Sequence, residues 1–131
     1  MATVKLIHYP EATPEVQAIF DDIKTTRNIP DVNNVWKALA NQPDNLKRMW
    51  QSVKDIMSAG AIDSVTKEMI YIAVSIMNNC DYCIHSHTAT ATAKGMTAEQ
   101  HQELLAVVGF ATMTNGIVTG LKVPIDERFL Q

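Results

Sequence analysis

Apolar residues recur at every third or fourth position along much of the chain, which is the spacing of a helix with one buried face. The segment 14–28 shows this spacing and begins with a proline, a favourable residue in the first helical turn. A second segment with the same features covers 43–59. Between the two, the sequence predicts a turn at 29–34 and a short helix at 35–40.

The middle of the chain is apolar on more than one side. A helix that begins at Asp63 or Ser64 and runs to about Met77 is predicted here, because Asp and Ser are common helix caps. Its second half is apolar nearly all round, which is typical of a buried helix. The asparagines at 78–79 are expected to break it.

Two more helices are predicted in the remaining sequence. The first begins at the cysteines and runs to Lys94, with Gly95 as the residue that ends it. The second is preceded by Thr97 and Gln100, which have the spacing of a capping box, and it continues through the apolar stretch 104–121.

Only the segment 4–9 could form a strand, and it has no clear partner. The predicted fold is therefore all-α, a bundle of about six or seven helices in a single domain of residues 1–131. The length suits one domain with one core, and an apolar share of 47% indicates a packed globule rather than a disordered chain.

Charge and hydropathy narrow the possible partners. The formal net charge of −3 argues against nucleic-acid binding, which needs a basic surface. The N-terminus has no apolar run long enough for a signal peptide, and the stretch 104–121 contains polar residues and three glycines. We therefore expect that stretch to be a buried helix or a subunit interface rather than a membrane span. Without a signal peptide or a membrane span, the expected compartment is the cytoplasm. A homo-oligomer is expected as well, because one thin helical layer cannot cover this much apolar surface.

The candidate chemistry lies in CDYCIHSH, residues 80–87, which holds both cysteines of the chain and two of its four histidines. On a helix at about 100° per residue, Cys80, Cys83 and His87 share one face, whereas His85 falls on the opposite side. A thiol near a helix N-terminus and a histidine ionises more easily, and the thiolate is the reactive form. Cα atoms three positions apart on a helix are about 5 to 5.5 Å from each other, so this pair is able to form a disulfide.

Three interpretations of this spacing stay open on the residues alone: redox chemistry, a metal site, or cysteines that only fill the core. The spacing offers three zinc ligands, whereas a structural zinc site needs four, and Asp81 or Glu68 would have to complete it. A c-type haem would require a histidine in place of Ile84, and no βαβ pattern indicates a thioredoxin-like fold.

Glu68 is a further candidate. An acid in the first turns of a helix is favourable in itself and is compatible with solvent exposure, yet the residues around it look buried. Along one continuous helix Glu68 would lie about 18 Å from Cys80. If the chain reverses at 78–81, the two helices pack side by side and Glu68 comes near the cysteines.

With Glu68, Cys80, Cys83 and His87 together, the chain resembles the alkylhydroperoxidase D-like (AhpD-like) branch of the carboxymuconolactone decarboxylase family. The signature of that branch is a glutamate, eleven residues, Cys-x-x-Cys, three residues and a histidine, and it is present here as E-MIYIAVSIMNN-C-DY-C-IHS-H. The resemblance covers about 50–121. It implies an all-α fold whose small subunits assemble into trimers or hexamers.

The resemblance also implies a peroxidase cycle with no bound cofactor or metal. Cys83 would attack the hydroperoxide as a thiolate, and His87 and Glu68 would form the proton relay that deprotonates it. Cys80 would then close a disulfide with Cys83. A dithiol reductant, such as a lipoyl-bearing or thioredoxin-like protein, would reopen that disulfide.

One residue departs from the family pattern, because Tyr82 stands between the cysteines where some members carry histidine. A second base is then missing, and a general thiol–disulfide oxidoreductase is the alternative activity. A non-catalytic helical oligomer that senses redox state or binds a metal is the other alternative. Lactone decarboxylation is not expected, since the decarboxylase branch lacks the cysteine pair.

Overall fold

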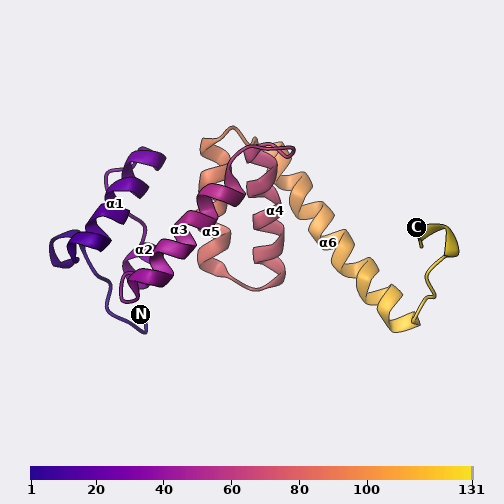
Figure 1. Cartoon of the computed structure of the whole chain (residues 1–131). Helices are drawn as coiled ribbons and strands as arrows, with labels where there is room; N and C mark the ends of the chain where they lie inside the picture. Colours follow the sequence, from indigo (N-terminus) through magenta and orange to yellow (C-terminus); the bar gives the residue numbers. More distant parts are fainter. Residues whose placement is uncertain (131) are drawn as a thin grey trace. The chain divides into compact units, whose positions relative to one another are not determined.

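The computed structural model of the chain describes residues 1–130, and in that range it is all-α with no strand (Figure 1). The predicted all-α class is confirmed, and the helices lie close to their predicted ranges. Two short 3-10 helices, η1 and η2, cover Tyr9–Glu11 and Glu127–Phe129. The α-helices are α1 Pro14–Arg27, α2 Asn34–Leu39, α3 Pro43–Met57, α4 Ser64–Met77, α5 Asp81–Ala93 and α6 Ala98–Leu121.

The segment 4–9, considered above as a possible strand, does not form one. The N–H of Ile7 donates to the carbonyl of Lys37 at 3.0 Å, and the side chain of Asn41 donates to the carbonyl of Lys5 at 2.7 Å. These bonds attach the segment to α2 and the residues that follow it, rather than to another strand.

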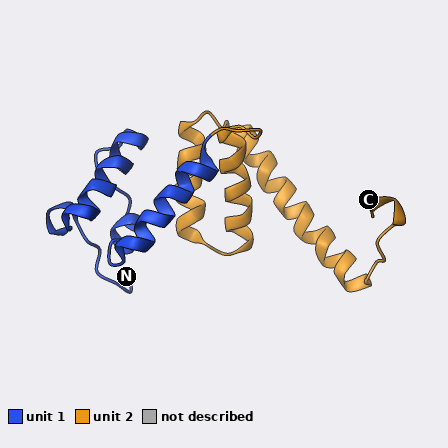
Figure 2. Cartoon of the chain, viewed as in Figure 1, with its two compact units in different colours: residues 1–58 blue, residues 59–131 orange. Residues whose placement is uncertain are grey.

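The chain forms two compact units, Met1–Ser58 and the residues from Ala59 onward (Figure 2). Each unit has its own cluster of buried apolar residues. All of the candidate site residues belong to the second unit. The assignment of the whole chain to a single domain stays a prediction.

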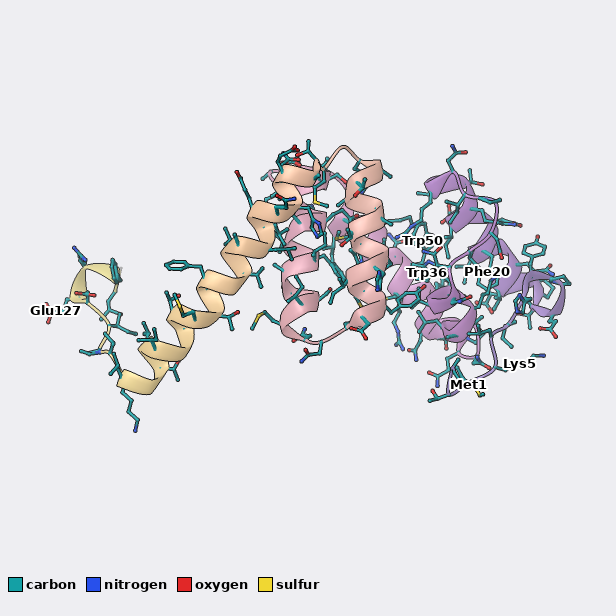
Figure 3. All side chains as sticks on the ribbon, turned by 180° about the vertical axis from the view of Figure 1, so that it is seen from behind. Met1, Lys5, Phe20, Trp36, Trp50 and Glu127 are labelled. Carbon is teal, nitrogen blue, oxygen red and sulfur yellow. A yellow bond between two sulfur atoms is a disulfide. The ribbon has the colours of Figure 1, made fainter. Side chains whose placement is uncertain are left out.

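The first unit packs α1 and α2 against α3 around aromatic side chains. Phe20, Trp36 and Trp50 lie together in its core (Figure 3), and the two indole rings meet edge to face with their centroids 5.6 Å apart. Asp22 accepts hydrogen bonds from the Trp50 indole N–H at 2.7 Å and from the Lys54 ammonium at 2.8 Å. These bonds give the Trp50 indole N–H an acceptor and help to fix α1 against α3.

The second unit is built on α4 and α5, which lie side by side, with the first half of α6 packed against α4 (Figure 1). Its core is small and takes a few residues from each element. Ile72 of α4, Ala91 of α5 and Leu104 of α6 are buried in it, together with Met96 from the connection between α5 and α6. This core holds the helix pair that carries the candidate site.

The chain reverses between α4 and α5 at the predicted asparagines. Asn79 adopts the left-handed conformation, with φ of 53°, which asparagine tolerates better than most residues. The N–H of Cys80 then bonds back to the carbonyl of Ser75 at 3.0 Å and ends α4. Cys80 is also the N-cap of α5, so this turn brings the first cysteine to the start of that helix.

The other end of α5 is closed by Gly95, whose φ of 107° would strain any residue with a side chain. Its N–H donates to the carbonyl of Thr92 at 3.0 Å. The N–H of Met96 donates to the carbonyl of Ala91 at 2.9 Å, which completes a Schellman motif. Met96 is buried, so the motif anchors the C-terminal end of α5 to the core. The predicted capping box at the start of α6 is also present.

The prediction that the second half of α4 is buried is wrong for the single chain. α4 packs on α5 and α6 along one side, and its other side leaves apolar residues exposed. The buried-helix interpretation of 104–121 is wrong as well, because α6 buries only Leu104. The exposed side chains, which we call the apolar surface, are Ile70, Tyr71, Val74 and Met77 of α4 and Leu105, Val107, Phe110, Met113, Ile117, Val118 and Leu121 of α6.

By length and composition alone, α6 is the one helix among residues 1–130 that could cross a membrane. A single helix of this kind is weak support for a membrane span.

Candidate active site

Both cysteines lie at the N-terminal end of α5, where they form a disulfide. Their Cα atoms are 5.3 Å apart, as expected for positions three apart at the start of a helix. Cys80 is the N-cap, and its sulfur accepts a hydrogen bond from the backbone N–H of Cys83 at 3.3 Å. Both residues are half-buried, so the sulfur atoms lie at the edge of the core rather than inside it.

Glu68 lies on α4 with its side chain only 4% exposed, and both of its carboxyl oxygens have partners on the α5 side. Oε2 is 2.6 Å from Nδ1 of His87, and Oε1 accepts a hydrogen bond from the Lys94 ammonium at 2.8 Å. The solvent-exposed alternative for Glu68 is therefore wrong. The chain reversal brings this carboxyl group to the helix that carries the cysteines.

The environment of Glu68 keeps its carboxyl group ionised. Burial by itself would raise the pKa of Glu68, because a charge loses hydration inside a protein. The hydrogen bonds from His87 and Lys94 act in the opposite direction and prevail, so this pKa lies below its ordinary value. At neutral pH the group is a carboxylate that accepts the Nδ1–H of His87. The Nε2 atom of the neutral imidazole then carries the lone pair that can take a proton.

Tyr71 holds the same imidazole from the other helix. Its ring is stacked on the ring of His87, with centroids 3.6 Å apart and planes 20° apart. Tyr71 follows Glu68 by three positions on α4, so both side chains reach the same part of α5. The bond to Glu68 and the stacked ring together restrict the rotation and the tilt of His87.

In the structure the predicted site residues form two contacting pairs, and each pair has one member within α5. Glu68 and His87 form one pair, and Cys80 and Cys83 form the other. His87 follows Cys83 by four positions, which is about one helical turn along the same face. His85, predicted to lie on the opposite side of the helix, is exposed.

Lys94 and Tyr71 are parts of this site that the sequence did not reveal. A helical projection contains a signal for Lys94, since eleven positions after Cys83 it returns to within about 20° of the same face. Because a lysine is common at the end of a helix for local reasons, the alignment of Lys94 with Cys83 does not stand out in the sequence. Tyr71 stands close to one turn from Glu68, but in a helix that is apolar nearly all round nothing distinguishes it from its neighbours.

Metal binding was one of the open interpretations of the cysteine spacing. Within residues 1–130, no three His, Cys, Asp or Glu side chains are grouped so that they could hold a metal ion. Asp81, a candidate fourth ligand, is exposed in the first turn of α5. Glu68, the other candidate, is engaged by His87 and Lys94. The four ligands of a structural zinc site are therefore not assembled in the described part of the chain.

Comparison with known families gives a match over residues 43–125 to the carboxymuconolactone decarboxylase family. This span is more than half of the chain and contains α3 to α6 with both residue pairs. The chain belongs to the carboxymuconolactone decarboxylase family.

The fold agrees with that of a solved relative. The crystal structure of the alkylhydroperoxidase AhpD core from Rhodospirillum rubrum is 54% identical in sequence and has a TM-score of 0.96, over 100% of this chain and 98% of that one. The chain therefore has the AhpD core fold and is an AhpD-like member of its family. The resemblance inferred from the Glu, Cys-x-x-Cys and His signature is confirmed.

Curated relatives are more distant. An uncharacterised protein of Cupriavidus necator is 30% identical over 87 residues, which are 66% of this chain and 75% of that protein. The alkyl hydroperoxide reductase AhpD of Corynebacterium kroppenstedtii is 30% identical over 69 residues, which are 53% of this chain and 38% of that protein. The match thus spans well under half the length of that reductase.

Proposed function

We propose that the protein is a thiol-dependent peroxidase that reduces hydroperoxides at Cys83 and then forms the Cys80–Cys83 disulfide. His87 and Glu68 are the proton relay that activates Cys83. The family, the AhpD core fold and the cysteine pair at the start of α5 support an oxidoreductase of this kind. The observation that carries the proposal is the buried carboxylate of Glu68, bonded to the imidazole one turn from Cys83.

The first step forms the nucleophile and uses it. Nε2 of His87 takes the proton of the Cys83 thiol, while Glu68 stabilises the resulting imidazolium through Nδ1. The thiolate attacks the terminal oxygen of the hydroperoxide, the O–O bond breaks, and Cys83 becomes a sulfenic acid. The leaving alkoxide takes the proton from His87 and departs as an alcohol.

The second step closes the disulfide. The Cys80 thiol attacks the sulfenic acid of Cys83, so that an S–S bond forms and water leaves. An external dithiol then reduces this disulfide and is itself oxidised. Each cycle consumes one hydroperoxide and one dithiol and releases one alcohol and one water. A lipoyl-bearing or thioredoxin-like protein has the dithiol chemistry that this step needs, and the cycle requires no bound cofactor or metal.

The position of the pair supports both steps. The unpaired N–H groups of a first helical turn and the helix dipole favour a negative charge on a nearby sulfur. The N–H of Cys83 already donates to the sulfur of Cys80. A Cα separation of 5.3 Å lies within the range that disulfides span, so the cycle needs no unfolding of α5.

We expect the reduced protein to lose both thiols when it is treated with one equivalent of an organic hydroperoxide, because Cys80 resolves the oxidised Cys83 within the same chain. Free thiols, residual hydroperoxide and the alcohol product are measured in the same samples, with thiol-alkylated protein as the control. Protein that leaves the hydroperoxide intact but reduces small disulfides would contradict the proposal and favour a general thiol–disulfide oxidoreductase. A disulfide that forms without turnover in the presence of a dithiol would favour a redox sensor.

We also propose that the protein is a homo-oligomer, a trimer or a hexamer. The apolar surface of α4 and α6 supports this, since covering such side chains with further copies of the chain removes them from water. Light scattering coupled to size exclusion, at micromolar concentration, is expected to give the mass of three or six chains. The mass of a single chain over the whole concentration range would contradict it.

The proposed location is the cytoplasm, with neither nucleic acid nor a membrane as partner. The net charge of −3 supports the first exclusion, because phosphate backbones attract basic surfaces. The AhpD core fold, in which α6 is one element of a helical unit, supports the second.

A further inference from the structure

The carboxylate of Glu68 is shared between two groups of the α5 side. Oε2 lies 2.6 Å from Nδ1 of His87, and Oε1 lies 2.8 Å from the Lys94 ammonium. The peroxidase cycle described above uses the first contact but not the second. Lys94 is thus a charged group that touches the relay and has no role in the cycle.

The backbone holds Lys94 in this position. It is the C-cap of α5, and the Schellman motif that follows it is anchored by the buried Met96. A lysine at a helix C-terminus is able to interact with the last carbonyls of its own helix, where the dipole is negative. Here the side chain extends to α4 and binds a carboxylate 26 positions earlier in the chain. The lysine side chain is 34% exposed and the carboxylate side chain 4%, so the contact lies at the edge of the core.

We propose that Lys94 is a positioning residue of the peroxidase site, which holds Oε1 of Glu68 so that Oε2 stays on Nδ1 of His87; this inference rests on the proposed function. The terminal torsion of a glutamate is broad, so a carboxylate with a single partner turns easily. With the ammonium on one oxygen and the imidazole on the other, the carboxylate is fixed from both sides. His87 then keeps its Nδ1–H toward Glu68 and its Nε2 available as a base.

Lys94 also influences the charge of the relay. Burial favours the neutral form of Glu68, and the bonds from His87 and Lys94 together hold its pKa below the ordinary value. These two groups act on the carboxylate from the α5 side, and Tyr71 of α4 is stacked on the imidazole. Without the ammonium, Glu68 would take up a proton at a higher pH. A protonated Glu68 would donate to His87 instead of accepting from it, and the imidazole would lose the tautomer that the relay needs.

The test replaces Lys94 by methionine, which keeps the apolar stem and removes the ammonium. The rate at which iodoacetamide alkylates Cys83 is measured from about pH 5 to about pH 9, in chains that also carry Cys80→Ser so that only one thiol reacts. We expect Lys94→Met to react roughly tenfold more slowly at pH 6 and at nearly the same rate at pH 9, where Glu68 is ionised in both proteins. Hydroperoxide consumption by Lys94→Met with Cys80 intact is expected to show the same displacement toward higher pH.

Two further variants separate positioning from structure. Lys94→Arg keeps the charge and can donate to Oε1, so we expect it to restore most of the rate at pH 6. Lys47→Met removes the same charge from an exposed position of α3 and is expected to leave the pH profile unchanged. A purely structural role for Lys94 would lower the thermal midpoint of Lys94→Met without moving its pH profile, and that result would overturn the proposal.

Alkylation does not require peroxide turnover, so the two proposals fail separately. A profile of Lys94→Met that superposes on that of the parent chain would overturn the role of Lys94, whatever the peroxidase activity. A displaced profile in a protein that leaves hydroperoxides intact would support Lys94 as a positioning residue for the thiol and overturn the peroxidase function. If Lys94→Met does not fold, Lys94→Leu, which also removes the ammonium and leaves no donor to Oε1, gives the same comparison, and an unchanged profile again overturns the proposal.

Discussion

Cys83→Ser is expected to abolish hydroperoxide turnover, with a loss of about three orders of magnitude or more. A serine hydroxyl is not ionised by an imidazole and a carboxylate to the extent that a thiol is, and it forms neither a sulfenic acid nor a disulfide. No oxidised intermediate then exists for a dithiol to reduce. The measurement is the consumption of cumene hydroperoxide with dihydrolipoamide as the reductant.

Cys80→Ser is the matched comparison, because it removes the resolving sulfur and keeps the attacking one. We expect one equivalent of hydroperoxide to be consumed and a sulfenic acid to persist on Cys83, where dimedone labels it for mass spectrometry. His85→Ala is the control, since this exposed histidine lies on the other side of α5 and is expected to leave turnover unchanged. A dimedone label on Cys80 in the Cys83→Ser protein would contradict the assignment of the two roles.

The ends of the helices could be predicted because residues within one turn determine them. Asp63 caps α4 and Thr97 caps α6 through their own side chains, as their types indicate. Gly95 ends α5 because it adopts a positive φ without strain, and Asn79 ends α4 in a similar way. Such signals need no knowledge of what the helix packs against.

Burial could not be predicted from the composition of a helix. The second half of α4 is apolar nearly all round, which is typical of a buried helix, and the stretch 104–121 of α6 is also largely apolar. In this chain each has neighbours along only part of its surface, and Val74 and Phe110 are exposed. The apolar positions of a helix reflect all of its packing contacts, whether these are made within the chain or with another copy of the chain. They therefore do not distinguish an internal core from a subunit interface.

The candidate site was predictable as far as it lies on one helix. Cys80 is the N-cap of α5, and Cys83 and His87 lie one turn apart on it, so the spacing alone predicts that the three are near one another. Glu68 comes near the cysteines only if the chain reverses at the asparagines. The family signature was needed to identify it as a site residue. Lys94 was missed because a lysine at the end of a helix already has a local explanation. Its actual partner becomes visible only when α4 packs against α5.

Glu68→Gln is expected to slow the oxidation of Cys83 by hydroperoxide about 10²- to 10³-fold at neutral pH. Glutamine has nearly the same volume, and its amide oxygen can accept the Nδ1–H of His87, so the orientation of the ring is retained. The charge is what is lost. The imidazolium that forms when Cys83 ionises no longer has a carboxylate beside it, and the ammonium of Lys94 faces a neutral amide. Single-turnover kinetics of thiol loss measure this rate, and a wild-type rate would contradict the relay.

The same substitution separates the effect of this charge on the reaction from its effect on folding. Burial would raise the pKa of Glu68, but the bonds from His87 and Lys94 hold it below the ordinary value of 4.5. The ionised carboxylate therefore stabilises the folded chain above that ordinary value, and the stabilisation is lost as the pH falls through the lower folded pKa. We expect denaturant unfolding to show that wild type loses stability relative to Glu68→Gln between neutral and acid pH. A difference in unfolding free energy that stays constant over this range would mean that the carboxylate is not held ionised by its two partners.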